Sequence, residues 1–232
     1  MAMNQPWYVK YTYPMLRGTF GPIVKGIWIK EVTGMENMPK EGPVIVALNH
    51  QSYLDFLSFI AVCPRPVHFL SAEKFFSNLF WAPLMYMSGQ IKVERKAHDK
   101  HALHDLIHSH LTRGKIIVGI FPEGTRAYDP TEMLHAFTGV AKYAVHSEVP
   151  VIPVGIKGAF EVMSRRDKAP KFKKNISIHV GSPIHFTEHH GREHDEKTYR
   201  ELTDRVMLEL SRLSGKNYSH VGKMERDAKR AI

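Results

Sequence analysis

The feature that most constrains the fold is a series of short apolar runs, each bounded by turn residues. Uncharged runs of roughly four to eight residues that end in turn signals are typical of buried strands. The clearest runs are 44–48, 116–120 and 149–156, and the further strand candidates 68–70, 91–95 and 176–180 are shorter or include polar residues. Helical periodicity separates or follows them, over 56–62, 97–112, 131–147 and 196–213. This alternation predicts an α/β fold: a single domain with a mixed central sheet flanked by helices. In the run 149–156, Pro150 and Pro153 indicate an edge strand or a bulge.

The segment 49–55 (NHQSYLD) joins the strand expected at 44–48 to a helix. His50 therefore lies where α/β sheets present their reactive groups. Histidine accepts a proton from a hydroxyl near neutral pH, and a carboxylate against its other ring nitrogen fixes the tautomer. Asp55 fits this second role only if His50 lies in the loop and Asp55 in the first helical turn. The structural alternative is a capping box, because Ser52 and Asp55 spell Ser-x-x-Asp ahead of an apolar run.

The segment 121–126 (FPEGTR) directly follows the run 116–120, so a second predicted strand ends in a polar turn. The planar guanidinium of Arg126 suits binding of a phosphate through two hydrogen bonds. Gly124 lets the backbone approach a ligand closely, and Glu123 is able to accept a proton from a hydroxyl. The structural alternative is a surface turn with a Glu–Arg ion pair.

Together these two motifs, about 70 residues apart, resemble the glycerolipid acyltransferases, most closely the 1-acylglycerol-3-phosphate (lysophosphatidic acid) acyltransferases. The segments 71–76 (SAEKFF) and 149–154 (VPVIPV) are similar to the second and fourth blocks of that family, and the resemblance runs from about residue 34 to 184. It implies that His50 and Asp55 are catalytic. The substrate-binding residues that it implies are Lys74, Arg95, Glu123, Gly124, Thr125 and Arg126. The family's Lys-x-Glu-Leu order is altered here, since Glu73 precedes Lys74.

The resemblance also implies a reaction. A fatty acyl group is expected to move from acyl-coenzyme A or acyl carrier protein to the sn-2 hydroxyl of a 1-acylglycerol 3-phosphate, giving phosphatidic acid. A thioester is already activated, so we expect a His/Asp general base with no acyl-enzyme, no cofactor and no metal. The nearest alternatives are sister enzymes that use glycerol 3-phosphate, another lysophospholipid or a lyso-ornithine lipid as acceptor.

The chain carries 32 Lys and Arg against 23 Asp and Glu, a formal net charge of +9. This excess favours anionic partners such as lipid head groups, phosphate substrates or an acidic carrier protein. The aromatic residues do not interleave with the basic patches as a stacking platform requires, so no nucleic-acid partner is expected. A non-catalytic protein that binds anionic membranes is the alternative from another functional class. The single cysteine, Cys63, excludes an intrachain disulfide, and burial is a better prediction for it than nucleophilic chemistry.

Residues 1–33 are expected to form an interfacial helical segment. Aromatic and basic residues flank an apolar stripe made of Leu16, Phe20, Ile23, Val24 and Ile27. This pattern predicts peripheral or monotopic association with an anionic membrane, at its cytoplasmic face. No segment reaches the roughly 20 apolar residues needed to span a bilayer. The alternative is a helix packed on the protein's own core, and Pro22 is expected to break or kink the helix in either case.

The acyltransferase domain is expected to cover 34–214, with a polar tail over 215–232. On the helix expected at 97–112, the spacing of His101, His104 and His108 is able to bind a metal, which would favour a metal hydrolase. These histidines lie opposite the apolar stripe, however, so a solvated surface is the default. The basic loop that begins at Arg165 and Arg166 favours contact with anionic lipid or with the acyl donor, and plain solvation is its alternative.

Overall fold

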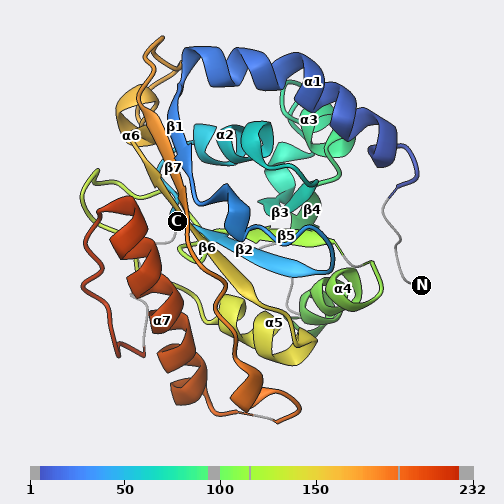
Figure 1. Cartoon of the computed structure of the whole chain (residues 1–232), viewed down its shortest axis with the longest axis vertical. Helices are drawn as coiled ribbons and strands as arrows, with labels where there is room; N and C mark the ends of the chain where they lie inside the picture. Colours follow the sequence, from blue (N-terminus) through green and yellow to red (C-terminus); the bar gives the residue numbers. More distant parts are fainter. Residues whose placement is uncertain (1–5, 94–99, 115, 193, 225–232) are drawn as a thin grey trace.

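The computed structural model describes residues 6–93, 100–114, 116–192 and 194–224. Within these residues the strands form one seven-stranded sheet in the order β1-β7-β6-β2-β5-β3-β4 (Figure 1). Strands β6, β2, β5, β3 and β4 run parallel to one another, whereas β7 pairs antiparallel with β6 and parallel with β1. The predicted α/β domain with a mixed sheet is confirmed.

The strands are β1 (Ile29–Thr33), β2 (Val44–Leu48), β3 (Val67–Ala72), β4 (Ile91–Val93), β5 (Ile117–Ile120), β6 (Val151–Lys157) and β7 (Ile176–Val180). The α-helices are α1 (Val9–Ile27), α2 (Leu54–Val62), α3 (Ala82–Met87), α4 (Lys100–Thr112), α5 (Gly139–Ser147), α6 (Ala159–Val162) and α7 (Glu196–Ser214). Short 3-10 turns are η1 (Met35–Asn37), η2 (Glu73–Phe75) and η3 (Thr187–His189).

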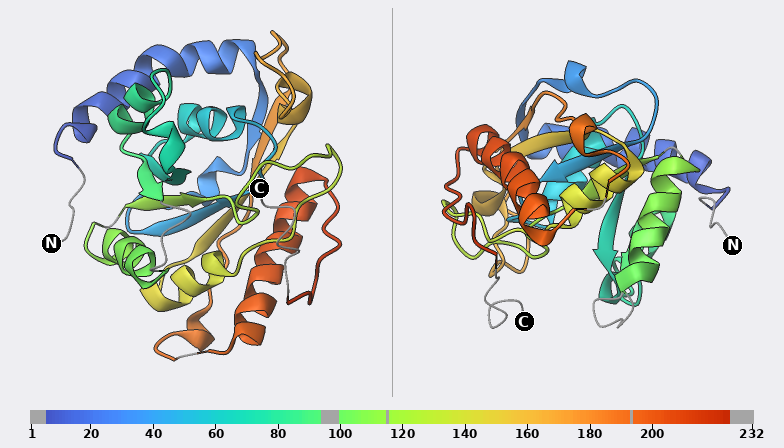
Figure 2. Two further views of the ribbon diagram at one scale, coloured as in Figure 1. Left: turned by 180° about the vertical axis from the view of Figure 1, so that it is seen from behind. Right: turned by 90° about the horizontal axis from the view of Figure 1, so that it is seen from below.

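Helices cover both faces of the sheet. One core packs α1 and α2 against one face, through side chains such as Tyr13 and Phe59. The other core packs α4, α5 and α7 against the opposite face, through side chains such as Ile107 and Val206. Figures 1 and 2 show the two groups of helices on opposite sides of the sheet. A strand covered on both faces buries every side chain, which explains why all of β2 is apolar and buried.

Strand β6 is interior, which overturns the edge-strand prediction for the run 149–156; the irregularity in its pairing lies opposite Pro153, in the segment that follows β7. Pro153 pairs with Ala47 in the parallel β2 ladder. On the β7 side, Val154 pairs with Val180 and Val151 pairs with Ile184. Between these two pairs the partner segment therefore has one residue more than β6. The Pro153 carbonyl accepts from Gly181 N at 2.8 Å on this side. Proline has no backbone N–H, and here its nitrogen faces the irregular part of the pairing, where a regular ladder bond is not required.

Two segments differ from the sequence prediction because they pack against each other. Helix α5 begins at Gly139, whereas a helix was expected from residue 131. Residues 131–137 instead meet the chain that follows α7, where Met133 N donates to Asn217 O at 2.9 Å. Residues 215–220, expected within a polar tail, therefore lie against the domain, and the Tyr218 side chain is buried. The pairing joins residues far apart in the sequence, so no local pattern signals it.

Helix α1 buries one face in the core and exposes apolar side chains on the other. It continues through Pro14 and Pro22 without interruption. Its inner face lies against α2 and buries Val9, Tyr13, Leu16 and Val24. Its outer face, with the turn before it, exposes Trp7, Tyr11, Met15, Phe20 and Ile23. The apolar stripe predicted from the sequence is thus divided between core and surface. No helix in the described part of the chain has the length and apolar character needed to cross a membrane.

Candidate active site

The two sequence motifs meet at one edge of the sheet. Strands β2 and β5 are adjacent and parallel, although β3 and β4 separate them in the sequence. Their carboxyl ends therefore share an edge, and the loops 49–55 and 121–126 follow directly from it. Ala127 N donates to His50 O at 2.8 Å, and His50 N donates to Glu123 Oε1 at 2.7 Å. These bonds hold the two loops together.

His50 and Asp55 form a hydrogen-bonded pair. His50 lies in the loop and Asp55 in the first turn of α2, which is the condition that the sequence set for this pair. His50 Nδ1 is 2.8 Å from Asp55 Oδ2, and the Asp55 side chain is 0% exposed while that of His50 is 15% exposed. A carboxylate has no hydrogen to donate, so Nδ1 carries a proton, and in the neutral ring the lone pair is then on Nε2. The imidazole is thereby oriented as a proton acceptor.

Asp55 also stabilises the backbone of its own loop. The same Oδ2 atom accepts from Gln51 N and Ser52 N, each at 2.7 Å. Ser52 Oγ accepts from Leu54 N at 3.1 Å and not from Asp55 N, so the Asp55 carboxylate makes its half of a capping box and the serine hydroxyl bonds one residue earlier. The structural and the orienting interpretations of Asp55 are therefore compatible, because one carboxylate oxygen serves both.

Glu123 occupies a different place from the one expected in the acceptor pocket. Its side chain is 0% exposed and lies behind the loops, where Oε1 accepts from His50 N and Oε2 accepts from Leu134 N, each at 2.7 Å. Burial raises the pKa of Glu123 to about 8, and the two backbone N–H bonds act in the opposite direction. The geometry makes Glu123 a residue that positions the His50 backbone.

An aromatic stack supports the imidazole. The rings of His50 and Phe121 are stacked with centroids 3.9 Å apart, and Phe69 stacks on Phe121 at 5.2 Å. Gly119 makes room for Phe69, because a Cβ there would lie 2.5 Å from the ring. Gly124 has φ of +65°, a left-handed conformation that glycine adopts without strain, so it turns the loop directly after the stack.

The basic residues predicted for substrate binding differ in how firmly they are placed. The guanidinium of Arg126 lies 3.6 Å from the centre of the Tyr53 ring, in the other motif. Phe75 packs edge-on against Tyr53 at 5.6 Å, and Lys74 Nζ lies 5.5 Å from the centre of the Phe75 ring. Lys74 is exposed on η2, and the Phe75 ring separates it from the Tyr53 ring on which Arg126 lies. Arg95 lies outside the described residues.

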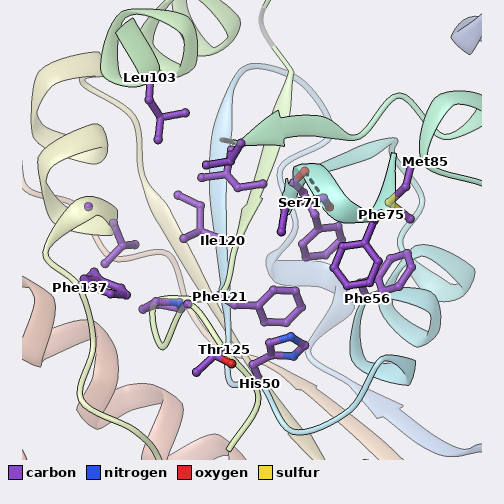
Figure 3. Close-up of a pocket in the computed structure, with 18 of the residues that line it drawn as sticks. His50, Phe56, Ser71, Phe75, Met85, Leu103, Ile120, Phe121, Thr125 and Phe137 are labelled. Carbon is purple, nitrogen blue, oxygen red and sulfur yellow. Dashed lines mark hydrogen bonds between the residues drawn. The ribbon is translucent and has the colours of Figure 1, made fainter. Parts of the chain in front are cut away.

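An apolar cavity of about 500 Å³ begins at His50. Figure 3 shows His50 and Thr125 at one end and Leu103 at the other, with Phe121 and Ile120 between. The other lining residues are mostly apolar and include Phe56, Phe69, Phe75, Trp81, Met85, Val93, Gly124, Phe137 and Tyr143. This size and character suit a small hydrophobic ligand or chain.

The histidine-rich face of α4 packs against α5. The ring centroids of His104 and His108 each lie 4.6 Å from that of His146. Among the described residues, no group of three or more His, Cys, Asp or Glu side chains is arranged to hold a metal ion. The side chain of His101 lies outside the described part.

The structure adds three residues that the sequence prediction did not assign. Tyr53 carries the Arg126 guanidinium, and Gln51 Nε2 donates to the carbonyls of the neighbouring turn, Asp129 O at 3.2 Å and Pro130 O at 3.1 Å. Both stand inside the first motif, which was their only signal. Arg165 reaches the second motif from the loop after α6, and its only signal was the basic character of that loop.

The fold and this site define the class: an α/β protein with an oriented histidine at one end of an apolar cavity. The sequence model of the Acyltransferase family matches residues 30–157, more than half of the chain. The chain therefore belongs to the acyltransferase family.

Individual relatives agree with this assignment. The 1-acyl-sn-glycerol-3-phosphate acyltransferase alpha of Mus musculus is 31% identical over 160 residues, which are 66% of this chain and 54% of that protein. The 1-acyl-sn-glycerol-3-phosphate acyltransferase of Bacillus subtilis (strain 168) is 23% identical over 156 residues, 67% of this chain and 73% of that protein. The chain spans about half the length of the mammalian relatives. The crystal structure of the 1-acyl-sn-glycerophosphate (LPA) acyltransferase PlsC from Thermotoga maritima has the same fold, with a TM-score of 0.67 at 21% identity over 90% of this chain and 82% of that one.

Proposed function

We propose that the protein transfers a fatty acyl group from an acyl thioester, carried by coenzyme A or acyl carrier protein, to the sn-2 hydroxyl of a 1-acylglycerol 3-phosphate. The observation that carries this proposal is the His50–Asp55 pair, which lies at one end of the apolar cavity, with Arg126 in the loop that is bonded to His50. The relatives named as 1-acyl-sn-glycerol-3-phosphate acyltransferases support the choice of acceptor.

In the proposed reaction, His50 Nε2 takes the proton of the acceptor hydroxyl as its oxygen attacks the thioester carbonyl carbon. Asp55 stabilises the imidazolium that forms, because its Oδ2 stays bonded to Nδ1. The tetrahedral intermediate collapses by breaking the carbon–sulfur bond, and the imidazolium returns the proton to the leaving thiolate. The products are phosphatidic acid and a free thiol, and no bond to the protein forms. Base catalysis of this kind contributes roughly 10²–10⁴-fold.

Positioning supplies much of the rest of the rate. Glu123 and Asp55 together bond the backbone N–H groups of residues 50 to 52, so the base rests on a fixed loop. Arg126 is proposed to bind the acceptor phosphate, with Tyr53 holding its guanidinium flat. Lys74 is proposed to contribute charge from the exposed side of the same aromatic group.

The cavity is proposed to bind the acyl chain of the donor. Its lining is apolar from Phe121 to Leu103, so a fatty chain loses its contact with water along this length. A thioester carbonyl at the His50 end then leaves the thiol carrier outside, at the exposed edge of the sheet. The far end of the cavity, at Leu103, is proposed to limit chain length (Figure 3).

Two exposed apolar features are proposed to place the enzyme on a membrane. One is the outer face of α1. The other is the tip formed by Leu79 and Phe80, which are 95% and 80% exposed. Asn78 Oδ1 accepts from Phe80 N and Trp81 N, both at 3.0 Å, so the tip is held in a defined turn. Trp81 lines the cavity, and a tip inserted among lipid tails would therefore bring the cavity close to its substrates.

The function is tested by mixing the protein with acyl-coenzyme A or acyl carrier protein thioester and competing acceptors, and identifying the product by mass spectrometry. We expect phosphatidic acid acylated at sn-2 to dominate. His50→Ala should abolish turnover, while the matched variant of an exposed histidine, His185→Ala, should keep it. Preferential acylation of glycerol 3-phosphate or of another lysophospholipid would refute the proposed acceptor, and full activity of a folded His50→Ala protein would refute the base.

A further inference from the structure

A second guanidinium lies beside Arg126. Arg165 Nη1 donates to Thr125 Oγ1 at 3.3 Å and to the carbonyl of Arg126 at 3.2 Å. Its guanidinium also lies 4.4 Å from the centre of the Tyr128 ring. Arg165 belongs to the loop after α6, which leaves the sheet at the end of β6. Because β6 is parallel to β2, this loop emerges at the same edge as His50.

The described residues around the two guanidinium groups offset their charge only in part. Within the described ranges, neither Arg126 nor Arg165 forms an ion pair with a carboxylate. Asp167, the carboxylate closest to Arg165 in the sequence, accepts from Ser164 N at 2.7 Å and lies 3.9 Å from Lys171 Nζ. Burial lowers the pKa of Arg126 and the positive charge of Arg165 lowers it further, while Tyr53 and the Asp55 carboxylate act in the opposite direction. Two such cations gain most from an anion placed between them.

We propose that Arg165 is a specificity-determining residue that acts with Arg126 to select a phosphate monoester over a phosphate diester. This inference rests on the proposed acyltransferase function. A monoester carries about −1.5 to −2 charges at neutral pH, whereas a diester carries only one. One guanidinium satisfies a single charge through two hydrogen bonds, so the second guanidinium contributes mainly when the phosphate is a dianion.

The position of Arg165 is fixed in a way that suits this role. Its Nη1 donates to Thr125 Oγ1 and to the Arg126 carbonyl, and its guanidinium lies over the Tyr128 ring. Thr125 lines the cavity, so these contacts hold the Arg165 side chain next to the cavity. The neighbouring Arg166 is exposed and, among the described residues, has no side-chain hydrogen bond or ion pair. Arg166 shares the loop and the charge, and it therefore provides a matched control.

The test compares two acceptors that differ by one charge, 1-acylglycerol 3-phosphate and its phosphate methyl ester. Variants are Arg165→Gln, which keeps N–H donors but loses the charge, Arg165→Lys, which keeps the charge, and Arg166→Gln. We expect Arg165→Gln to lower the ratio of kcat/KM for monoester over methyl ester about tenfold, mainly through the KM of the monoester. Arg165→Lys should recover part of the ratio, and Arg166→Gln should leave it unchanged. Inorganic phosphate should inhibit the wild type competitively with the acceptor and inhibit Arg165→Gln more weakly.

Each other outcome overturns the proposal. If Arg165→Gln lowers kcat/KM equally for both acceptors, Arg165 only positions the loop 121–126. If Arg165→Gln raises the KM of acyl-coenzyme A and leaves the acceptor ratio intact, the anion at this site belongs to the donor. An equal fall in the ratio for Arg166→Gln would reflect the general charge of the loop. Failure of the proposed function is distinguishable, because the wild type itself would then form no phosphatidic acid.

Discussion

Replacing Asp55 by Asn separates the charge of this carboxylate from its role as a hydrogen-bond acceptor. In Asp55→Asn, an amide oxygen placed at the Oδ2 position still accepts from His50 Nδ1, Gln51 N and Ser52 N. The amide NH₂ then takes the Oδ1 position, where the described residues supply no hydrogen-bond partner for the carboxylate. The fold should therefore persist while the negative charge is lost.

The size of the effect follows from the burial and the distance. Asp55 is fully buried, and the 2.8 Å contact puts the centres of charge of the carboxylate and an imidazolium about 4 Å apart. At an effective dielectric constant of about 20, their attraction is about 4 kcal/mol for a full charge, and roughly half of that for a partly formed imidazolium. A loss of about 2–4 kcal/mol of transition-state stabilisation lowers kcat about 30-fold to 1,000-fold.

The assay is initial-rate acylation with saturating acceptor, together with thermal and chemical unfolding. Asp55→Ala serves as the comparison, because it also leaves Gln51 N and Ser52 N without an acceptor. At about 1–3 kcal/mol for each buried N–H group, Asp55→Ala should lose roughly 2–6 kcal/mol of unfolding free energy, and Asp55→Asn much less. A folded Asp55→Asn protein with more than about a third of the wild-type kcat would refute the electrostatic role, and equal stability of the two variants would refute the backbone role.

Three further predictions follow from the structure. Glu123→Gln should change the pH dependence of stability: the pKa of Glu123, about 8 in the folded protein, lies above its ordinary value, so wild-type stability falls as pH rises from about 4.5 to 8. The unfolding free energy of Glu123→Gln, measured against wild type, should therefore rise over that window by up to about 5 kcal/mol, and a constant difference would contradict the cause given. Leu103→Phe, at the far end of the cavity, should shift donor preference to shorter chains by about fourfold in kcat/KM for each excluded methylene, and an unchanged chain-length profile would disprove the cavity assignment. Replacing Leu79 and Phe80 by Ser should weaken sedimentation with anionic vesicles at least about tenfold without altering Tm, whereas undiminished binding would locate the membrane contact elsewhere.

Much of the site is local in the sequence and could be predicted from it. His50 and Asp55 stand five positions apart in one loop and one helical turn, so their hydrogen bond depends only on where the helix begins. The apolar runs 44–48 and 116–120 also predicted strands β2 and β5, because a strand that is buried on both faces has apolar side chains throughout. The amphipathic segment before β1 predicted a helix, although its division between core and surface required the position of α2.

What the sequence could not decide depends on contacts between distant segments. Glu123 looked like a ligand-binding residue, but packing of the loop 121–126 under His50 turned its carboxylate toward two backbone N–H groups. Helical periodicity could not show that residues 131–133 pair with Asn217, because this strand-like contact forms only when the chain after α7 is in place.

The sequence by itself determined the fold class, the strand ends that carry the chemistry and the histidine–aspartate pair, because each rests on burial patterns or on residues a few positions apart. The tertiary structure alone decided that β6 is interior, that the cavity extends from His50 to Leu103, and that Arg165 lies beside Arg126. The physical reason is the order of the strands: the sheet places the ends of β2, β5 and β6 side by side, and this order follows from the packing of the whole domain and not from any local stretch of the chain.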